Sequence, residues 1–368
     1  MATARRLLIW VCLAPLAACR AASVDYDRDA SPATGADLGD TGEPATTDDG
    51  AERDSAAEPG EVEAGGADGD GAVPEQALDG SVDAEPALPL DAMSQPAHDA
   101  TPPTTIPDAT IAVPTPGCLA GITDYKQRGP FGFRSEQDGK IKLFVPSSVP
   151  ADCKLPIVHV GNGTGASCSN YMAVIEHLAS HGFLVTCYES ASFVESHCLQ
   201  AVDAAYRLHP ELAGNALGFT GHHTGAAGAY VCVQRAEETW GSSRLYAGHA
   251  AQPASGTGDS PNWQATYAKI RSPMFQFHGS EDVLVSAGWV KQSYDALADS
   301  TEAYWFEARG ATLIPVAARY MQESSVVFFR WKLLGDMAAC RYFQDMQRSA
   351  DWSLAGQQNA ATCESTQP

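Results

Sequence analysis

The feature that most constrains this chain is the five-residue stretch Gly221-His222-His223-Thr224-Gly225. It follows an apolar run at 216–219 and precedes a run of small residues at 226–229, which is the pattern of a buried strand joined directly to a helix. Glycines at both ends allow a strand and a helix to meet in a tight turn. The stretch therefore predicts a strand–turn–helix unit that pushes its middle residue, His223, into a cleft.

Strands and helices are predicted to alternate along the rest of residues 116–368. This alternation indicates a mostly parallel sheet covered by helices on both faces, so we expect an α/β fold. The segment is long enough for one sizeable domain with a single core. Apolar runs predict strands at 141–146, 155–160, 183–187, 215–220, 245–249, 274–278 and 303–306, and helical spacing predicts helices at 169–180, 196–208, 224–238, 286–298 and 318–334.

The N-terminus has the pattern of an export signal. Arg5 and Arg6 precede an apolar run at 7–16, which is too short to span a bilayer. Small residues then lead to Cys19, as in a bacterial lipobox, where the cysteine is lipidated. The alternative is an ordinary signal peptide with an incidental Cys19. The lipobox interpretation predicts a lipoprotein signal peptide at 1–19 and an exported protein of the bacterial cell envelope, held on a membrane by Cys19.

Residues 20–115 have a different composition from the rest. They contain 22 Asp and Glu against three Arg and no Lys, a net charge of −19 out of −22 for the whole chain. Ala, Gly, Pro, Ser and Thr make up most of the remainder, so the segment cannot bury enough apolar surface to fold. We predict a disordered acidic linker that holds the folded domain away from the membrane. The negative charge argues against a nucleic-acid partner.

The chain has ten cysteines, of which eight remain once Cys12 and Cys19 are assigned to the signal and the lipid. An even number in an exported protein indicates disulfides, and none of the spacings suits a zinc site. We predict a Cys340–Cys363 disulfide, because it would attach the C-terminal tail to the last predicted helix. The connectivity of the other cysteines stays open.

Several motifs occur in an order that resembles the α/β-hydrolase superfamily, in particular its secreted branch of cutinases, poly(ethylene terephthalate) hydrolases and dienelactone-hydrolase-like esterases. The resemblance covers 117–352 and implies the α/β-hydrolase fold, with 221–225 as the nucleophile elbow G-x-S-x-G. It also implies ester hydrolysis by a serine, a histidine and an acid, with backbone amides that stabilise the oxyanion. The motifs are 161–165, 178–183, the elbow, His278-Gly279-Ser280-Glu281-Asp282, Gly310-Ala311-Thr312-Leu313 and the closing stretches 329–336 and 351–352.

The resemblance also assigns the parts of the site. His223 stands at the nucleophile position and Asp282 at the acid position. The neighbouring Glu281 is the alternative candidate for the acid. The oxyanion donors would be the backbone amides of Thr164 and Thr224. Leu313 stands where the family has its catalytic histidine.

The serine and the histidine are therefore both missing. The family order of acid and then histidine cannot be completed, because no histidine follows His278. We expect a degenerate hydrolase, a monomer without cofactor or metal, which either keeps a cleft for an ester-like small molecule or polymer or serves as a structural surface domain.

Two alternatives stay open. An active hydrolase with relocated residues would use His223 beside Asp282, together with Thr224, Ser167, Ser169 or Ser190. A metal site would use His222, His223 and Asp282 or Glu281, although adjacent histidines in such a turn usually point apart. Trp263 and Trp289 either line a cleft for an apolar ligand or are packing residues.

Overall fold

The computed structural model describes residues 7–11, 20–24, 119, 121–190, 195–255, 262–313 and 319–364. The chain forms two compact units, Met1–Met93 and Ser94–Pro368. In the first unit, β1 (Leu7–Val11) pairs antiparallel with β2 (Arg20–Val24). β1 lies in the predicted signal peptide and β2 at the start of the predicted linker. Cys19 and residues 25–118 lie outside the described residues. None of the described helices has the length and apolar character needed to cross a membrane.

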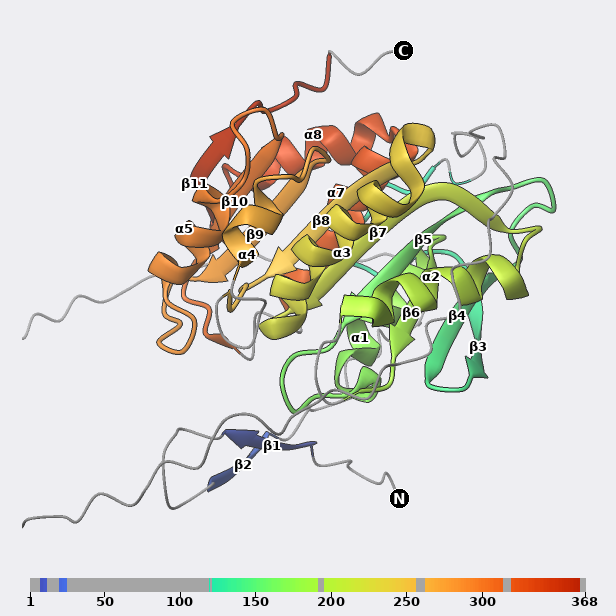
Figure 1. The fold of residues 1–368 in the computed structure, drawn as a ribbon, viewed down its shortest axis with the longest axis horizontal. Coiled ribbons are helices and arrows are strands. Elements are labelled where there is room, and N and C mark those ends of the chain that lie inside the picture. The colour runs from blue at the N-terminus through green and yellow to red at the C-terminus, as the bar shows by residue number, and fades with distance from the viewer. Residues whose placement is uncertain are drawn as a thin grey trace, which may run out of the picture. The chain divides into compact units, whose positions relative to one another are not determined.

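The second unit is built on a nine-stranded sheet with the order β11-β10-β9-β8-β7-β5-β6-β4-β3 (Figure 1). The neighbours from β10 to β6 in this order are parallel, whereas β11 at one edge and β4 and β3 at the other pair antiparallel. The strands are β3 (Gly132–Asp138), β4 (Ile141–Ser147), β5 (Leu155–Gly161), β6 (Leu184–Tyr188), β7 (Ala213–His222), β8 (Leu245–Ala251), β9 (Met274–Gly279), β10 (Ala303–Ala308) and β11 (Trp352–Gln358).

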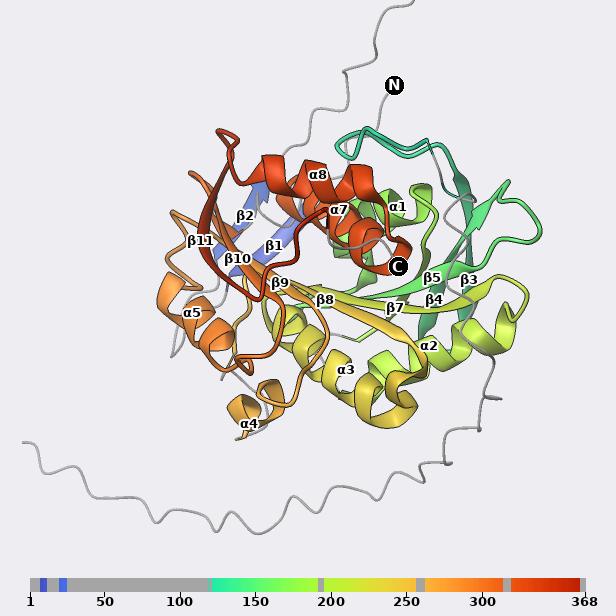
Figure 2. The same ribbon diagram turned by 90° about the horizontal axis from the view of Figure 1, so that it is seen from above.

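Helices cover both faces of this sheet, as the sequence predicts. Figure 2 shows α1, α7 and α8 on one face and α2, α3, α4 and α5 on the other. The mostly parallel α/β architecture is therefore confirmed. The helices are η1 (Cys168–Tyr171), α1 (Met172–Ser180), α2 (Glu195–Leu208), α3 (Thr224–Trp240), η2 (Gly241–Ser243), α4 (Trp263–Tyr267), α5 (Ala287–Asp295), α7 (Met321–Leu334) and α8 (Met337–Met346).

Every strand and helix predicted in this domain is present, with ends that differ by a few residues. The elements that the sequence does not predict are mostly peripheral: β3, α4, α8 and β11. The edge strands β3 and β11 are exposed or half-buried at nearly every position, so they lack the apolar signal of the central strands. The central strand β5, in contrast, is buried at every residue.

An aromatic cluster packs α7 and α8 against β9 and β10. Phe275, Phe306, Phe328 and Phe343 come from these four elements, and their ring centroids lie 5.0–5.7 Å apart. Aromatic pairs at this spacing contribute about 0.5–1.5 kcal/mol beyond the apolar area that they bury. The cluster fixes β9 and β10, whose carboxyl ends lead into the loops with Asp282 and Leu313.

Three disulfides join described cysteines, and the predicted Cys340–Cys363 bond is among them. Cys198–Cys232 connects α2 with α3, and Cys168–Cys187 attaches η1 to β6, directly after the 161–165 loop. The disulfides indicate an oxidising, extracytoplasmic environment. In the described part of the chain, no group of His, Cys, Asp and Glu is arranged to hold a metal ion.

Candidate functional site

The residues singled out in the sequence meet at the carboxyl ends of the central parallel strands. β5 pairs with β7, β7 with β8, and β8 with β9, so the loops that follow these four strands lie side by side. These loops carry the 161–165 stretch, His223, Gln252 and Asp282, respectively. In open parallel sheets, this edge is where ligands bind.

His223 occupies the turn between β7, which ends at His222, and α3, which begins at Thr224. Its backbone has φ 56° and ψ −119°, a conformation that residues other than glycine rarely adopt. The His223 N–H donates to Ala251 O at 3.1 Å, and Ala254 N–H donates to His223 O at 3.2 Å. Strain of this kind costs about 1–3 kcal/mol and is concentrated at functional sites.

The two glycines of the elbow are required because the backbone is crowded there. A Cβ on Gly221 would lie 2.2 Å from Gly225 O, and a Cβ on Gly225 would lie 2.3 Å from Gly161 O. Any side chain at either position would force backbone segments apart. The glycines thus let the elbow and the 161–165 loop approach each other closely.

We expect Gly225→Ala to lower the free energy of unfolding by about 3 kcal/mol, because the clash is with backbone that cannot move aside. Urea unfolding followed by circular dichroism measures the change. Gly288→Ala in α5 is the matched control, since the nearest atom to its added Cβ would be Ser286 Oγ at 3.7 Å. That variant should be neutral or slightly stabilising. Equal stability of the two variants would contradict a close approach at the elbow.

The His223 imidazole is half-buried and forms no hydrogen bond or ion pair within the described parts of the chain. Desolvation lowers its pKa, and the charge of Asp282 raises it by a smaller amount. The ring is therefore neutral at pH 7. Asp282 acts on it through space, without a direct contact.

Asp282 is not a solvated loop acid, because both of its carboxylate oxygens have partners. Oδ1 accepts the N–H groups of Leu284 at 2.7 Å and Val285 at 3.1 Å. Oδ2 accepts a hydrogen bond from the side-chain Nε2 of Gln252. The rival acid, Glu281, is exposed, and its backbone N–H donates to Ala311 O. The structure thus holds Asp282 in place and leaves Glu281 at the surface.

Leu313 lies in the loop beside the acid, where the resemblance expects the catalytic histidine. The turn before Leu313, which contains Ala311, packs tightly against the end of β9. A Cβ added to Gly279 there would lie only 2.0 Å from Ala311 O. The Leu313 side chain packs in a small apolar cluster with Val285 and Val290, and its backbone contacts the His222 imidazole. An aliphatic side chain at this position cannot carry a proton.

The predicted oxyanion residues also come together. Thr164 Oγ1 and Thr224 Oγ1 lie 3.0 Å apart, so the 161–165 loop and the start of α3 are adjacent. Neither Thr164 N–H nor Thr224 N–H donates to another of the described residues. Beside His223, these two backbone N–H groups thus have no acceptor among the described residues.

Sequence reasoning missed two residues of this site. Gln252 follows β8 with φ 52°, is fully buried and contacts Asp282. Tyr171 lies within the helix predicted at 169–180, yet its hydroxyl accepts Gly163 N–H at 3.0 Å and lies 3.2 Å from His222 Nδ1. No local sequence pattern indicates either contact. His222 is buried at the end of β7.

The alternative hydroxyl groups have other partners. Ser167 Oγ bonds Ser169 Oγ at 2.8 Å and Asn170 Oδ1 at 3.1 Å, and Thr224 Oγ1 bonds Thr164. Ser190 contributes its carbonyl to Asn162 Nδ2 at 3.1 Å. Ser167, Ser169 and Thr224 therefore contact hydroxyl or amide groups and no imidazole.

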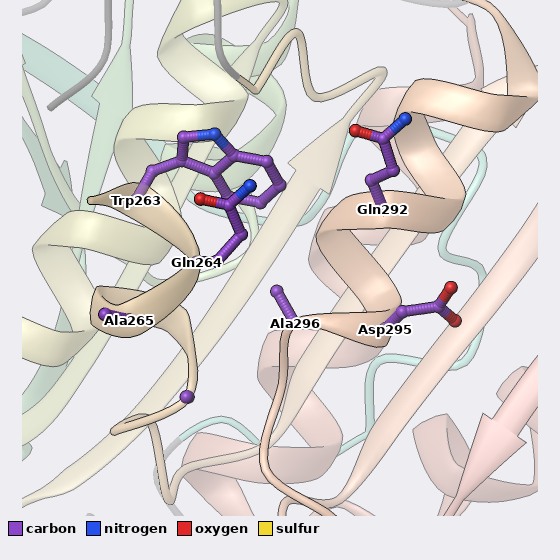
Figure 3. Close-up of a pocket in the computed structure, with 7 residues that line it drawn as sticks. Trp263, Gln264, Ala265, Gln292, Asp295 and Ala296 are labelled. Atoms are coloured by element: carbon purple, nitrogen blue, oxygen red, sulfur yellow. The ribbon is translucent and has the colours of Figure 1, made fainter. Parts of the chain in front are cut away.

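The two tryptophans are in different environments. Trp263 is buried, and it lines a pocket of about 510 Å³ between α4 and α5 (Figure 3). None of the residues around His223 lines this pocket, so Trp263 belongs to a separate surface feature. Trp289 is 39% exposed near the start of α5, after the acid loop. The residues that line the pocket are Trp263, Gln264, Ala265, Ala268, Gln292, Asp295 and Ala296.

The fold and this site define an α/β protein whose strained strand–turn–helix elbow presents a histidine. Neither a scan against protein-family models nor a search of curated proteins finds a match for this chain. Its function must therefore be argued from the geometry of the site.

Proposed function

We propose that residues 116–368 are an α/β-hydrolase domain, related to the secreted cutinase-like esterases, that has lost the serine–histidine–acid reaction and binds an ester-like ligand in its cleft. The order of the parts supports this proposal. The elbow follows one central strand, the acid loop follows a later one, and the Leu313 loop comes last, which is the order of nucleophile, acid and histidine in that fold.

The observation that carries the proposal is the state of His223. It has the strained backbone of a residue presented for chemistry, yet its imidazole has no hydrogen-bonded partner in the described residues. Asp282, the acid that would orient a base, is bonded to Gln252 and to two backbone amides instead. Without a relay from residue 223 to an acid, the proton transfers of ester hydrolysis lack their catalyst.

The groups that would hold a ligand are retained. The amides of Thr164 and Thr224 suit a carbonyl or carboxylate oxygen, and the partial positive charge at the start of α3 adds to this. Apolar side chains in the segment just after Asp282 suit the hydrocarbon part of an ester. They are Val283, Leu284 and Trp289, which are 91%, 38% and 39% exposed.

We also propose that the domain is exported and membrane-attached as a bacterial lipoprotein. The disulfides support export, and the arginines, apolar run and small residues before Cys19 support lipidation of that residue. The acidic linker would then separate the domain from the membrane surface.

One observation favours a second candidate, a slow esterase that uses His223 itself. The imidazole is neutral because desolvation lowers its pKa, and it lies beside the amides of Thr164 and Thr224, which have no acceptor among the described residues. Its unprotonated nitrogen would attack the ester carbonyl carbon and expel the alcohol part, which takes up the proton of the other ring nitrogen and leaves a neutral acyl-imidazole. Water would then hydrolyse the acyl-imidazole to the carboxylic acid and free His223.

Hydrolysis of a short-chain p-nitrophenyl ester by the full chain and by His223→Ala separates the two candidates. For a binding domain, we expect the two rates to agree within about twofold. A drop of tenfold or more in His223→Ala would replace the first candidate with the second. Titration with butyrate tests ligand binding directly, since the amide NMR signals of Thr164 and Thr224 should shift. Unchanged signals at millimolar butyrate would contradict an oxyanion-type site.

A further inference from the structure

A series of buried polar groups leads from the acid loop to the loop that carries Thr164. At one end, Gln252 Nε2 donates to Asp282 Oδ2. At the other end, Gly163 N–H donates to Tyr171 Oη at 3.0 Å, and this hydroxyl lies 3.2 Å from His222 Nδ1. Between the two ends lies the His222 imidazole, whose pKa is influenced by the nearby Gln252 side chain and Leu313 backbone, although its Nε2 has no hydrogen-bond partner among the described residues.

The middle of this series is buried. His222 is 9% exposed and Gln252 is 0% exposed. Within this series, His222 Nε2 and Gln252 Oε1 are buried and have no hydrogen-bond partner among the described residues. A buried polar atom without a hydrogen bond lowers the stability of the fold. We therefore expect His222 Nε2 and Gln252 Oε1 to form a hydrogen bond with each other.

The two ends of the series fix the direction of every hydrogen bond in it. The Asp282 carboxylate can only accept, so Gln252 turns its NH₂ group toward Asp282 and leaves Oε1 for His222. His222 must then donate from Nε2–H, which leaves Nδ1 as an acceptor. Tyr171 donates to Nδ1 while its oxygen accepts Gly163 N–H, a group that can only donate.

We propose that Gln252 and His222 are positioning residues: Gln252 gives Asp282 the N–H that a catalytic histidine would supply, and His222 connects this pair to the oxyanion loop. The chain of donors runs Gly163 N–H, Tyr171 O–H, His222 Nε2–H and Gln252 Nε2–H, and it ends on Asp282. It holds the 161–165 loop and the Asp282 loop in fixed positions relative to each other, although the catalytic triad is incomplete. The assignment deepens the proposed function and rests on it.

The protonation of His222 tests this chain without any activity measurement. We expect the imidazole nitrogen NMR signals of the full chain at pH 7 to show His222 as the Nε2–H tautomer. The signals can be assigned by their loss in His222→Gln. An Nδ1–H tautomer would overturn the proposal, because Gln252 and Tyr171 could not then have the stated orientations.

The second measurement asks whether Asp282 controls His222, with which it shares no hydrogen bond. Asp282→Ala removes the acceptor that orients Gln252, so the Gln252 amide can turn and offer N–H to His222. We expect the His222 nitrogen signals to shift toward the Nδ1–H form. Glu281→Ala removes the adjacent, exposed acid and should leave His222 unchanged. Unchanged His222 signals in folded Asp282→Ala would overturn the proposal.

Gln252→Glu provides an independent variant in case Asp282→Ala fails to fold. A carboxylate beside Nε2 should raise the pKa of His222, which burial lowers to about 4 in the native chain, by at least about one unit. An unchanged pKa would show that residue 252 does not contact His222. Esterase activity of the wild type would contradict the proposed function and leave these spectroscopic results as they are, so the two failures are distinguishable.

Discussion

At pH 5, the folded domain should be less stable than at pH 7.5 by roughly 8 kcal/mol, because four buried histidines resist protonation. Burial lowers the pKa of His159 and His249 to about 3 and the pKa of His181 and His222 to about 4. In the unfolded chain, each histidine has a pKa of about 6.5. The unfolded state therefore binds more protons as the pH falls below 6.5, and the stability present above that pH is lost. Each histidine accounts for about 2 kcal/mol at pH 5.

The surroundings of His249 illustrate why the neutral form is preferred. Its Nε2 bonds Ser324 Oγ at 2.8 Å, and Ser324 donates its own proton to Tyr320 O, so Nε2 carries a hydrogen. Its Nδ1 is 2.8 Å from Thr220 Oγ1, which can donate to it. Both nitrogens of the neutral ring are satisfied, and no described acid forms an ion pair with the ring. A second proton would place an uncompensated charge in the core.

Guanidinium chloride unfolding at several pH values from 7.5 to 5, followed by tryptophan fluorescence, measures this effect. His249→Gln is the control: the difference between the two pH limits should shrink by about 2 kcal/mol, whatever the variant's own stability. Burial raises the pKa of Glu323 and Asp203, so these groups take up protons in the folded state and oppose the histidines. A total change below about 2 kcal/mol would contradict the prediction.

The sequence predicts the parts of this protein that depend on local patterns. The elbow is recognisable because two glycines separate an apolar run from a helix. The structure explains both glycines, because an added Cβ would lie only 2.2 or 2.3 Å from a backbone oxygen. The Cys340–Cys363 pair is also confirmed, although Cys340 lies in α8 (Met337–Met346), which the sequence did not predict, and not in the last predicted helix. Central strands are predicted because burial on both sides leaves a continuous apolar run.

Gln252 shows what local patterns cannot predict. Its role depends on φ 52°, on the pairing of β8 with β9 and on Asp282, 30 residues further along the chain. Tyr171 is similar, because its ring fits the helical spacing of core residues while its hydroxyl bonds Gly163 and His222. Both contacts exist only once the sheet has brought separate loops to one edge. This explains why the elements of the site were predictable and their hydrogen-bond partners were not.

The double variant His223→Ser with Leu313→His should hydrolyse a short-chain p-nitrophenyl ester at least about 100-fold faster than the wild type. Serine would restore the hydroxyl at the elbow, and histidine at 313 would restore the base in the loop beside Asp282. Asp282 is already held by the N–H groups of Leu284 and Val285 through Oδ1. Its Oδ2 accepts from Gln252 and has capacity for a second donor, so an imidazole N–H could join it there.

Three controls test whether the gained activity comes from a serine–histidine–acid triad. Each single variant should stay near the wild-type rate, because a serine without a base and a base without a serine are both ineffective. Asp282→Asn should lower the hydrolysis rate of the double variant at least tenfold, since an amide does not hold the imidazole in the required tautomer. Glu281→Gln in the same background should have little effect, because Glu281 is exposed. If the double variant has native circular dichroism and still reacts no faster than the wild type, the cleft does not have hydrolase geometry, and the proposed function is wrong.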